Sequence, residues 1–554
     1  MRRLLPLIFI PWLLAASGHW ALYTSGPFVV LTDAGAHAGQ GTLLRFEEFR
    51  HALGQIIGEP DLETPVPIRV LVFKDARGWI SSTSLAEGRD CYAIALAANA
   101  PIPSAVYTGL TRLFLESNTK RMPAHFEHGL IELFSTFQIT GIHITVGEPP
   151  PNPDLDWARV HLLASDPQYY GRLRVLLYNL RQGVDQSAAY QNAFGKSPAE
   201  IEAQAKTHLA AGNFQLAVIS SRPLTERDFR EKAVSDSDVR LSRADLLAGA
   251  QSAAEYKALI HDQVKVAESW EGLGLLALRD HNQSEAHRDF SAAIDAGSKS
   301  ARCYIEYAKL EPDHAKATQA LLRAAGINSK LDEPFALLAQ HETDPQKRLM
   351  YWKDAAQRNP RNAAYWKALA EGYLAEHNFT EAAKAWTAGE QAASDPAERE
   401  RMHQARMAIE KQRLDYEDTA RKQQADADAR ELDTLKQEAR AHVHQLESEY
   451  SDSKPVNEDK VVPWWSGSKA PAHVTGSLSK VDCLRTGTRL VIAGDDHKTI
   501  RLLIPDPSKI VMTGTGDMSL GCGVQQPRRV SIQYFPKSNP KLATTGEVAT
   551  IEFQ

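Results

Sequence analysis

The sequence of 554 residues predicts a multidomain, mainly α protein with a small all-β part at its end. Three observations lead to this fold class. Strand and helix patterns alternate up to about residue 215, Ala-rich helical segments recur from about residue 240, and a charged run without Gly or Pro fills 397–450. We therefore expect an α+β domain, an α-solenoid, a long charged helix and a small β barrel or sandwich, in that order.

The first segment, 1–20, has the features of a secretory signal peptide. Arg2 and Arg3 precede an apolar run, Leu4–Ala16, which is shorter than the roughly 20 residues of a membrane span and is followed by small residues. We expect an exported protein, periplasmic or extracellular, with no stable transmembrane span beyond this segment. An uncleaved signal that serves as an anchor is the alternative. The net charge of −6 argues against a general nucleic-acid binder.

The segment 26–215 combines strand and helix patterns. Gly26–Asp33 and Pro67–Phe73 are apolar runs next to turn residues, and they predict strands. Between them, Leu43–Ile57 has apolar residues at helical spacing. Val106–Phe137 then predicts two amphipathic helices, the second beginning at a proline. Further strands and a series of helices are expected at Ala93–Leu96, Thr140–Gly147 and Leu155–Asn213.

The second amphipathic helix carries a phrase of the peptidase-MA-like gluzincins, a family of zinc metallopeptidases. The matching residues are Met122, Pro123, Phe126, Gly129, Leu130, Glu132 and Phe134. The segment 26–215 resembles the domain of that family, in which a preceding helix bears His-Glu-x-x-His. On this alignment Thr108 and Arg112 replace the two zinc-binding histidines, and Gly109 replaces the general-base Glu. The third ligand, a Glu, becomes His128. A zinc hydrolase needs three ligands and a base, so the resemblance implies an inactive peptidase without zinc or another cofactor.

A rearranged metal site is one alternative for this helix. His125 and His128 are three residues apart and project to neighbouring positions, with Glu132 one turn further on. Their spacing matches neither His-Glu-x-x-His nor His-x-x-Glu-His. Solvated or capping histidines are another interpretation. A third is a cleft, inherited from the peptidase, that still binds an extended peptide.

From 240 to 395 the chain consists of Ala-rich helices with an internal period. Two units share the spacing of the tetratricopeptide pattern and lie 96 residues apart, close to three repeats: Trp270, Gly274, Ala286 and Phe290, then Trp366, Tyr373, Ala382 and Trp386. The segment therefore resembles a tetratricopeptide-repeat array, and these residues are expected at packing positions. Stacked hairpins leave a concave groove, and such arrays bind peptides or proteins. A plain helical bundle is the alternative.

The segment 397–450 is dense in charged residues, Gln and Ala, which favours a long solvated helix. Its apolar positions are too sparse for a sustained heptad pattern. We expect an extended single helix or a weak coiled-coil spacer, and a dimerisation zipper is the alternative. The following segment, 451–472, is a predicted linker.

Residues 473–554 predict a compact barrel or sandwich, because short alternating strands are separated by turn residues. Cys483 and Cys522 can form a disulfide in an oxidising compartment. The phrases Val-Asp-Cys, Leu-Ile-Pro-Asp-Pro and Cys-Gly make this segment similar to a C-terminal β module of exported bacterial proteins. That resemblance implies no particular activity.

Together these parts predict an exported, non-catalytic adaptor that binds a protein or peptide partner through its repeat array. The hypothesis depends on the lost zinc ligands and on the array. Two alternatives stay open. One is a zinc metallopeptidase with rearranged ligands, and the other is an envelope spacer whose long helix holds two domains apart.

Overall fold

The computed structural model describes residues 19–75, 85–140, 143–247, 249–451, 470–514 and 518–554. The chain divides into two compact units, Met1–Ala429 and Arg430–Gln554, and each is described by itself. The predicted signal peptide, except for its last two residues, and most of the predicted linker lie outside the described residues. Within the described part of the chain, no helix combines the length and the apolar character that a membrane span requires.

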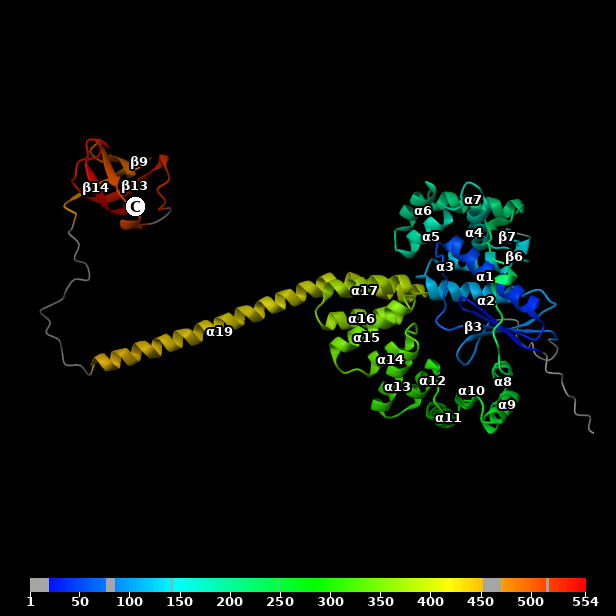
Figure 1. Cartoon of the computed structure of the whole chain (residues 1–554). Helices are drawn as coiled ribbons and strands as arrows, with labels where there is room; N and C mark the ends of the chain where they lie inside the picture. Colours follow the sequence, from blue (N-terminus) through cyan, green and yellow to red (C-terminus); the bar gives the residue numbers. More distant parts are fainter. Residues whose placement is uncertain (1–18, 76–84, 141–142, 248, 452–469, 515–517) are drawn as a thin grey trace, which may run out of the picture. The chain divides into compact units, whose positions relative to one another are not determined.

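A five-stranded mixed sheet opens the N-terminal domain (Figure 1). Its order is β1-β2-β3-β5-β4, in which β2, β3 and β5 are parallel and the two outer strands are antiparallel to their neighbours. Helix α1 connects β2 to β3, as a parallel pair requires. These elements are β1 Ala21–Ser25, β2 Phe28–Thr32, α1 Ala36–Ile57, β3 Ile68–Phe73, β4 Ala86–Glu87 and β5 Tyr92–Ala97.

Helices α2 and α3 pack on α1 through aromatic rings. The centroid of the Phe49 ring, on α1, lies 5.3 Å from that of Tyr107 on α2 and 5.8 Å from that of Phe134 on α3. All three side chains are buried, so the apolar face predicted for Val106–Phe137 is the face that meets α1. The helices of the domain are α2 Ser104–Asn118, α3 Ala124–Ser135, α4 Leu155–Ser165, α5 Leu173–Arg181, α6 Gln186–Phe194 and α7 Pro198–Ala211.

A second, three-stranded sheet carries the domain beyond its predicted end at residue 215. Strand β8 (Ala217–Ser220) pairs antiparallel with β7 (His143–Val146), and β7 pairs with β6 (Gln138–Thr140). Lys232 then forms a bridge to Leu22 on β1. The predicted boundary is therefore too early, because strand pairing keeps the chain on this domain to about residue 232.

The start of the domain also differs from the prediction. Strand β1 precedes residue 26 and pairs with β2 over its full length. Trp20 packs edge-to-face on Phe73, with 5.8 Å between the ring centroids. Trp20 is the last residue of the predicted signal segment, and the end of that segment stays a prediction.

Stacked helix pairs form the repeat array. Helix α10 packs on α11, α12 on α13, α14 on α15 and α16 on α17, and each pair packs on the next (Figure 1). This arrangement agrees with the predicted tetratricopeptide-type array. The bounds are α8 Asp236–Ala244, α9 Gly249–His261, α10 Val266–Arg279, α11 Gln283–Asp295, α12 Ala301–Leu310, α13 His314–Ile327, α14 Glu333–His341, α15 Pro345–Arg358, α16 Ala363–Ala375 and α17 Phe379–Ala392.

The two best-matched pairs share the same turn. His281 and His377 each have a positive φ, 57° and 56°, between the two helices of their pair. The next residues, Asn282 and Asn378, cap the following helix by accepting a backbone N–H. Identical turn geometry at corresponding positions is a second sign of the internal repeat.

The long helix begins later than predicted. Helix α18 (Pro396–Met407) packs on α17, and its Met402 is buried against Gly389. Ala408 ends α18, and the long helix is α19 (Ile409–Ser451). The prediction of one helix over 397–450 is therefore wrong, because α18 covers the end of the array and extends it past residue 395. Nearly every side chain between 410 and 449 is exposed.

The second unit ends in six strands that pair in the order β11-β10-β9-β13-β14-β12. Strand β11 also pairs in parallel with β14, through Leu502 and Gly546, so the pairing closes on itself. A disulfide joins Cys483 to Cys522. Each strand overlaps a predicted one: β9 Ala472–Leu484, β10 Gly487–Gly494, β11 Thr499–Ile504, β12 Val511–Gly514, β13 Gly523–Phe535 and β14 Gly546–Phe553.

Candidate functional site

The three positions at which the sequence predicts lost zinc-site residues lie on the less buried face of α2. Thr108 and Gly109 are half-buried and Arg112 is exposed. Leu85 lies over Gly109, because a Cβ built at this glycine would be 3.0 Å from the Cβ of Leu85. None of the three residues carries an imidazole or a carboxylate. Helix α2 therefore supplies neither a zinc ligand nor a general base at these three positions.

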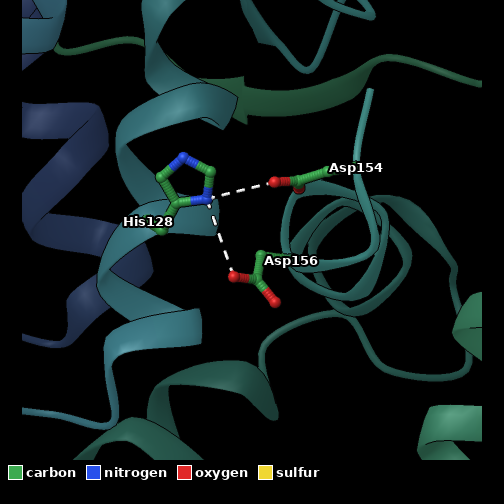
Figure 2. Close-up of side chains that lie close together, drawn as sticks. All are labelled: His128, Asp154 and Asp156. Atoms are coloured by element: carbon green, nitrogen blue, oxygen red, sulfur yellow. Dashed lines mark ion pairs between the residues drawn. The ribbon is translucent and has the colours of Figure 1, made fainter. Parts of the chain in front are cut away.

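His128, on α3, is predicted to replace the third zinc ligand, and it meets other ligand-type side chains. Its Nδ1 lies 3.3 Å from Oδ2 of Asp154 and 3.6 Å from Oδ2 of Asp156 (Figure 2). Among the described residues, no other group of three His, Cys, Asp or Glu side chains brings its ligand atoms within 4.8 Å of one another. Both carboxylates have further partners, because Asp154 accepts the N–H of Trp157 and Asp156 pairs with Arg159 at 2.9 Å. The group is an exposed ion-pair cluster at the start of α4.

The predicted residual metal site of His125, His128 and Glu132 is not assembled, because the ligand atoms of these three residues do not come within 4.8 Å of one another. The His125 ring packs on Phe126, with 4.6 Å between centroids. Burial, helped by the charge of Arg159, lowers the pKa of His125. The sequence spacing alone could not show that His125 turns toward the packed side of α3, whereas His128 faces α4.

The residues that match the repeat pattern pack inside the array. Gly274 permits close contact between α10 and α11, because a Cβ there would lie 2.7 Å from the Phe290 ring. Trp270, Trp366 and Tyr373 are partly buried against the same clusters. The fully or nearly fully buried members are Ala286, Phe290, Ala382 and Trp386.

The array is held against the N-terminal domain at the turn between α2 and α3. Arg361, just before α16, is 7% exposed and donates from Nε to the carbonyl of Thr119 at 2.8 Å. Its Nη2 donates to Oε1 of Glu127 at 2.8 Å, and its Nη1 donates to Oε2 at 3.2 Å. Burial lowers the pKa of Arg361, and Glu127 opposes this effect. The guanidinium is nevertheless fully partnered, which is the condition for burying it.

A second buried network holds the other end of the array. Arg89, in the loop before β5, donates to Oε2 of Glu271 on α10 at 2.5 Å and lies 3.5 Å from Asp245. Arg69 on β3 donates to Asp245 at 2.9 Å, and Tyr256 donates to the same carboxylate at 2.7 Å. Burial alone would lower the pKa of Arg89, but the surrounding carboxylates raise it well above its ordinary value. These contacts fix two ends of one array–domain interface.

Two clefts remain open between these contacts. The first, which we call the α2–α16 cleft, has a volume of about 1060 Å³ and is lined by the 61–65 loop, α2, the 329–332 loop and the 354–364 segment. The second, the β5–α12 cleft, has a volume of about 1120 Å³ and is lined by 87–92, 264–271 and 296–309. Because both the array and the domain contribute walls, sequence reasoning about either part alone misses them.

A buried histidine pair lies in the N-terminal domain, outside these clefts. His161, on α4, has no exposed surface, and its Nδ1 lies 2.9 Å from Nε2 of His208 on α7. The rings of Trp157 and Phe214 pack around the pair. Burial, together with the charge of His208, lowers the pKa of His161 to about 4. The sequence gives no local signal of this pair, because its members are 47 residues apart.

No family model matches this chain. No curated protein matches it either. Solved structures of tetratricopeptide-repeat proteins are similar to part of it. MamA shares 15% identity, covering 29% of this chain and 96% of its own with a TM-score of 0.24. YrrB, described as a TPR protein with an unusual peptide-binding site, shares 18% identity over 30% of this chain and 92% of its own, with a TM-score of 0.26. PilF of Pseudomonas aeruginosa shares 16% identity over 30% of this chain and 80% of its own, with a TM-score of 0.25.

Proposed function

We propose that this chain is an exported, non-catalytic adaptor that binds a protein or peptide segment in the α2–α16 cleft. The cleft lies between an inactive, metallopeptidase-like domain and the helical array. One observation carries the proposal: the cleft is large enough for a ligand, and buried contacts at Arg361 and Arg89 hold its two walls in place. A preformed site of this size loses little freedom when it binds a ligand.

The metallopeptidase-like character of the N-terminal domain is part of the same proposal. A mixed sheet with an antiparallel outer strand precedes two packed helices, and the substituted positions Thr108, Gly109 and Arg112 lie on the first of them. With no ligand or base at these three positions, we infer a domain that keeps a metallopeptidase-like framework without the chemistry. It serves as one wall of the binding cleft.

Blocking the cleft tests this function. Ala364 is exposed and lines the α2–α16 cleft, so Ala364→Trp fills part of it. We expect the full chain to bind members of a random peptide array and the Ala364→Trp variant to lose that binding. Ala427→Trp, at an exposed position of α19, is the matched control and should bind normally. Equal binding by both variants would place the site elsewhere.

A metallopeptidase with rearranged ligands is the second candidate, favoured by the cluster of His128, Asp154 and Asp156. It requires one bound zinc ion per chain after purification, lost in His128→Ala, and zinc-dependent degradation of an unfolded substrate. The adaptor proposal requires neither. Elemental analysis of the two proteins separates the candidates directly.

A spacer is the third candidate, favoured by the exposure of α19 along its length. Its 43 residues would span about 65 Å at 1.5 Å per residue. Small-angle scattering tests this idea, since a maximum particle dimension that stays unchanged when α19 is shortened by whole turns would remove it.

A further inference from the structure

The charges around the α2–α16 cleft are unequally partnered. The lining contains six acidic residues and four basic ones. Each basic side chain has a partner within the protein: Lys330 pairs with Glu63, Arg358 with Asp354 and Arg361 with Glu127, and Arg121 donates to the carbonyl of Ala392. The basic side chains of the lining are therefore already partnered within the protein.

Three of the six acidic side chains have no hydrogen-bond or ion-pair partner among the described residues. They are Asp61, Glu116 and Glu398, and they come from the loop after α1, from α2 and from α18. The first two are exposed and the third is half-exposed, so a ligand in the cleft can reach all three. A positively charged ligand in the cleft would therefore meet three carboxylates that have no partner within the described residues.

The β5–α12 cleft supplies an internal comparison. Its acidic side chains are paired, for example Glu271 with Arg89, Glu268 with Lys265 and Glu306 with Lys309. The free carboxylates are thus a property of the α2–α16 cleft, and the β5–α12 cleft does not share it.

An aromatic side chain lines the same cleft as the free carboxylates. Tyr92, on β5, is half-buried and lines the cleft. Burial raises the pKa of Tyr92, and the charges of Glu87 and Glu116 raise it further. A cleft lined by a tyrosine ring and by free carboxylates is a suitable environment for a guanidinium or ammonium group.

Resting on the proposed function, we infer that the α2–α16 cleft takes a cationic peptide segment, one with several Arg or Lys residues. The basic side chains would pair with Asp61, Glu116 and Glu398. An exposed charge pair contributes a few-fold to affinity, so the three together give about a tenfold preference for a cationic peptide over a neutral one. Salt should weaken this preference, because the pairs are open to solvent.

Fluorescence anisotropy on the full chain tests the inference. The probes are three labelled peptides of equal length, built from alternating Ser with Arg, Gln or Glu. We expect the Arg peptide to bind about tenfold more tightly than the Gln peptide at low salt. The triple variant Asp61→Asn, Glu116→Gln, Glu398→Gln should lose this preference. Glu431→Gln, Glu438→Gln, Glu447→Gln removes the same charge from exposed positions of α19 and should keep it.

The possible outcomes separate the two proposals. If the Gln and Glu peptides bind the full chain as tightly as the Arg peptide, the cationic preference is wrong and the adaptor function stands. The same conclusion follows if the triple variant binds the Arg peptide as the control variant does. If none of the three peptides binds the full chain, the adaptor function fails with it. A circular dichroism melt of each variant confirms that it is folded.

Discussion

Removing the Arg361–Glu127 pair should loosen the repeat array from the N-terminal domain. Arg361 makes four hydrogen bonds, two to Thr119 and two to the Glu127 carboxylate, and its side chain is 5% exposed. Glu127 also accepts the N–H of Met122 at 2.8 Å. Arg361→Met leaves this carboxylate, in a site that is 15% exposed, with only the more distant Arg121 at 3.9 Å as its cation. Loss of one partner of a buried pair costs about 3 kcal/mol.

A double-mutant cycle isolates the contribution of the pair. We expect Arg361→Met and Glu127→Gln each to lower the free energy of unfolding, and the double variant to show a coupling of about 2 kcal/mol. Urea unfolding followed by tryptophan fluorescence measures it, and hydrogen exchange of α16 reports the local loosening. The control cycle uses Arg288 and Glu285, whose side chains are 68% and 48% exposed, and should give less than about 0.5 kcal/mol. Equal coupling in the two cycles would refute the idea that burial at the interface makes the pair strong.

Three further predictions concern the interiors of the separate parts. His161 is protonated near pH 6.5 in the unfolded chain but only near pH 4 in the folded chain. Its contribution to the free energy of unfolding should therefore be fully present above about pH 6.5, and the free energy of unfolding should fall by about 3 kcal/mol as the pH drops to 4. Urea titrations of the protein and of His161→Gln at several pH values check this. Gly274→Ala should lower the melting temperature, since its Cβ would clash with a buried ring, whereas Gly326→Ala, also within a helix but with open space, should leave it unchanged or raise it. Replacing Cys483 and Cys522 by Ala opens a loop of sequence separation 39 and should destabilise the C-terminal strands by about 4 kcal/mol. Urea unfolding measures this change, and unchanged stability would contradict the loop-entropy account.

The sequence predicted those elements whose residues repeat at a regular spacing. The apolar period of Val106–Phe137 marks α2 and α3, because both helices bury one continuous face. The repeat pattern marks α10, α11, α16 and α17, whose packing residues fall at corresponding positions. Strand β1 was missed because it follows directly on the apolar run assigned to the signal peptide and is only five residues long. The break at Ala408 was missed because neither Gly nor Pro marks it.

The sequence did not predict the candidate site, for a different reason. The walls of the α2–α16 cleft come from residues such as Glu116 and Asn362, which are more than 200 positions apart in the chain. Arg361 and Arg89 look like ordinary surface residues in the sequence, and only long-range contacts show that they are buried. Local patterns report how a segment packs within its own element. They carry no information on which distant segment it will face.

The buried charges at the array–domain interface determine which fragments of this chain can be prepared in isolation. A fragment of the array alone would carry the carboxylates of Asp245 and Glu271 without Arg89 and Arg69, which partner them in the intact chain. Such a piece should be less stable than the array within the intact chain. By contrast, a protease that cuts the chain in the connecting segment near Ala233 should yield two polypeptides that separate on a denaturing gel and elute as one species from a sizing column.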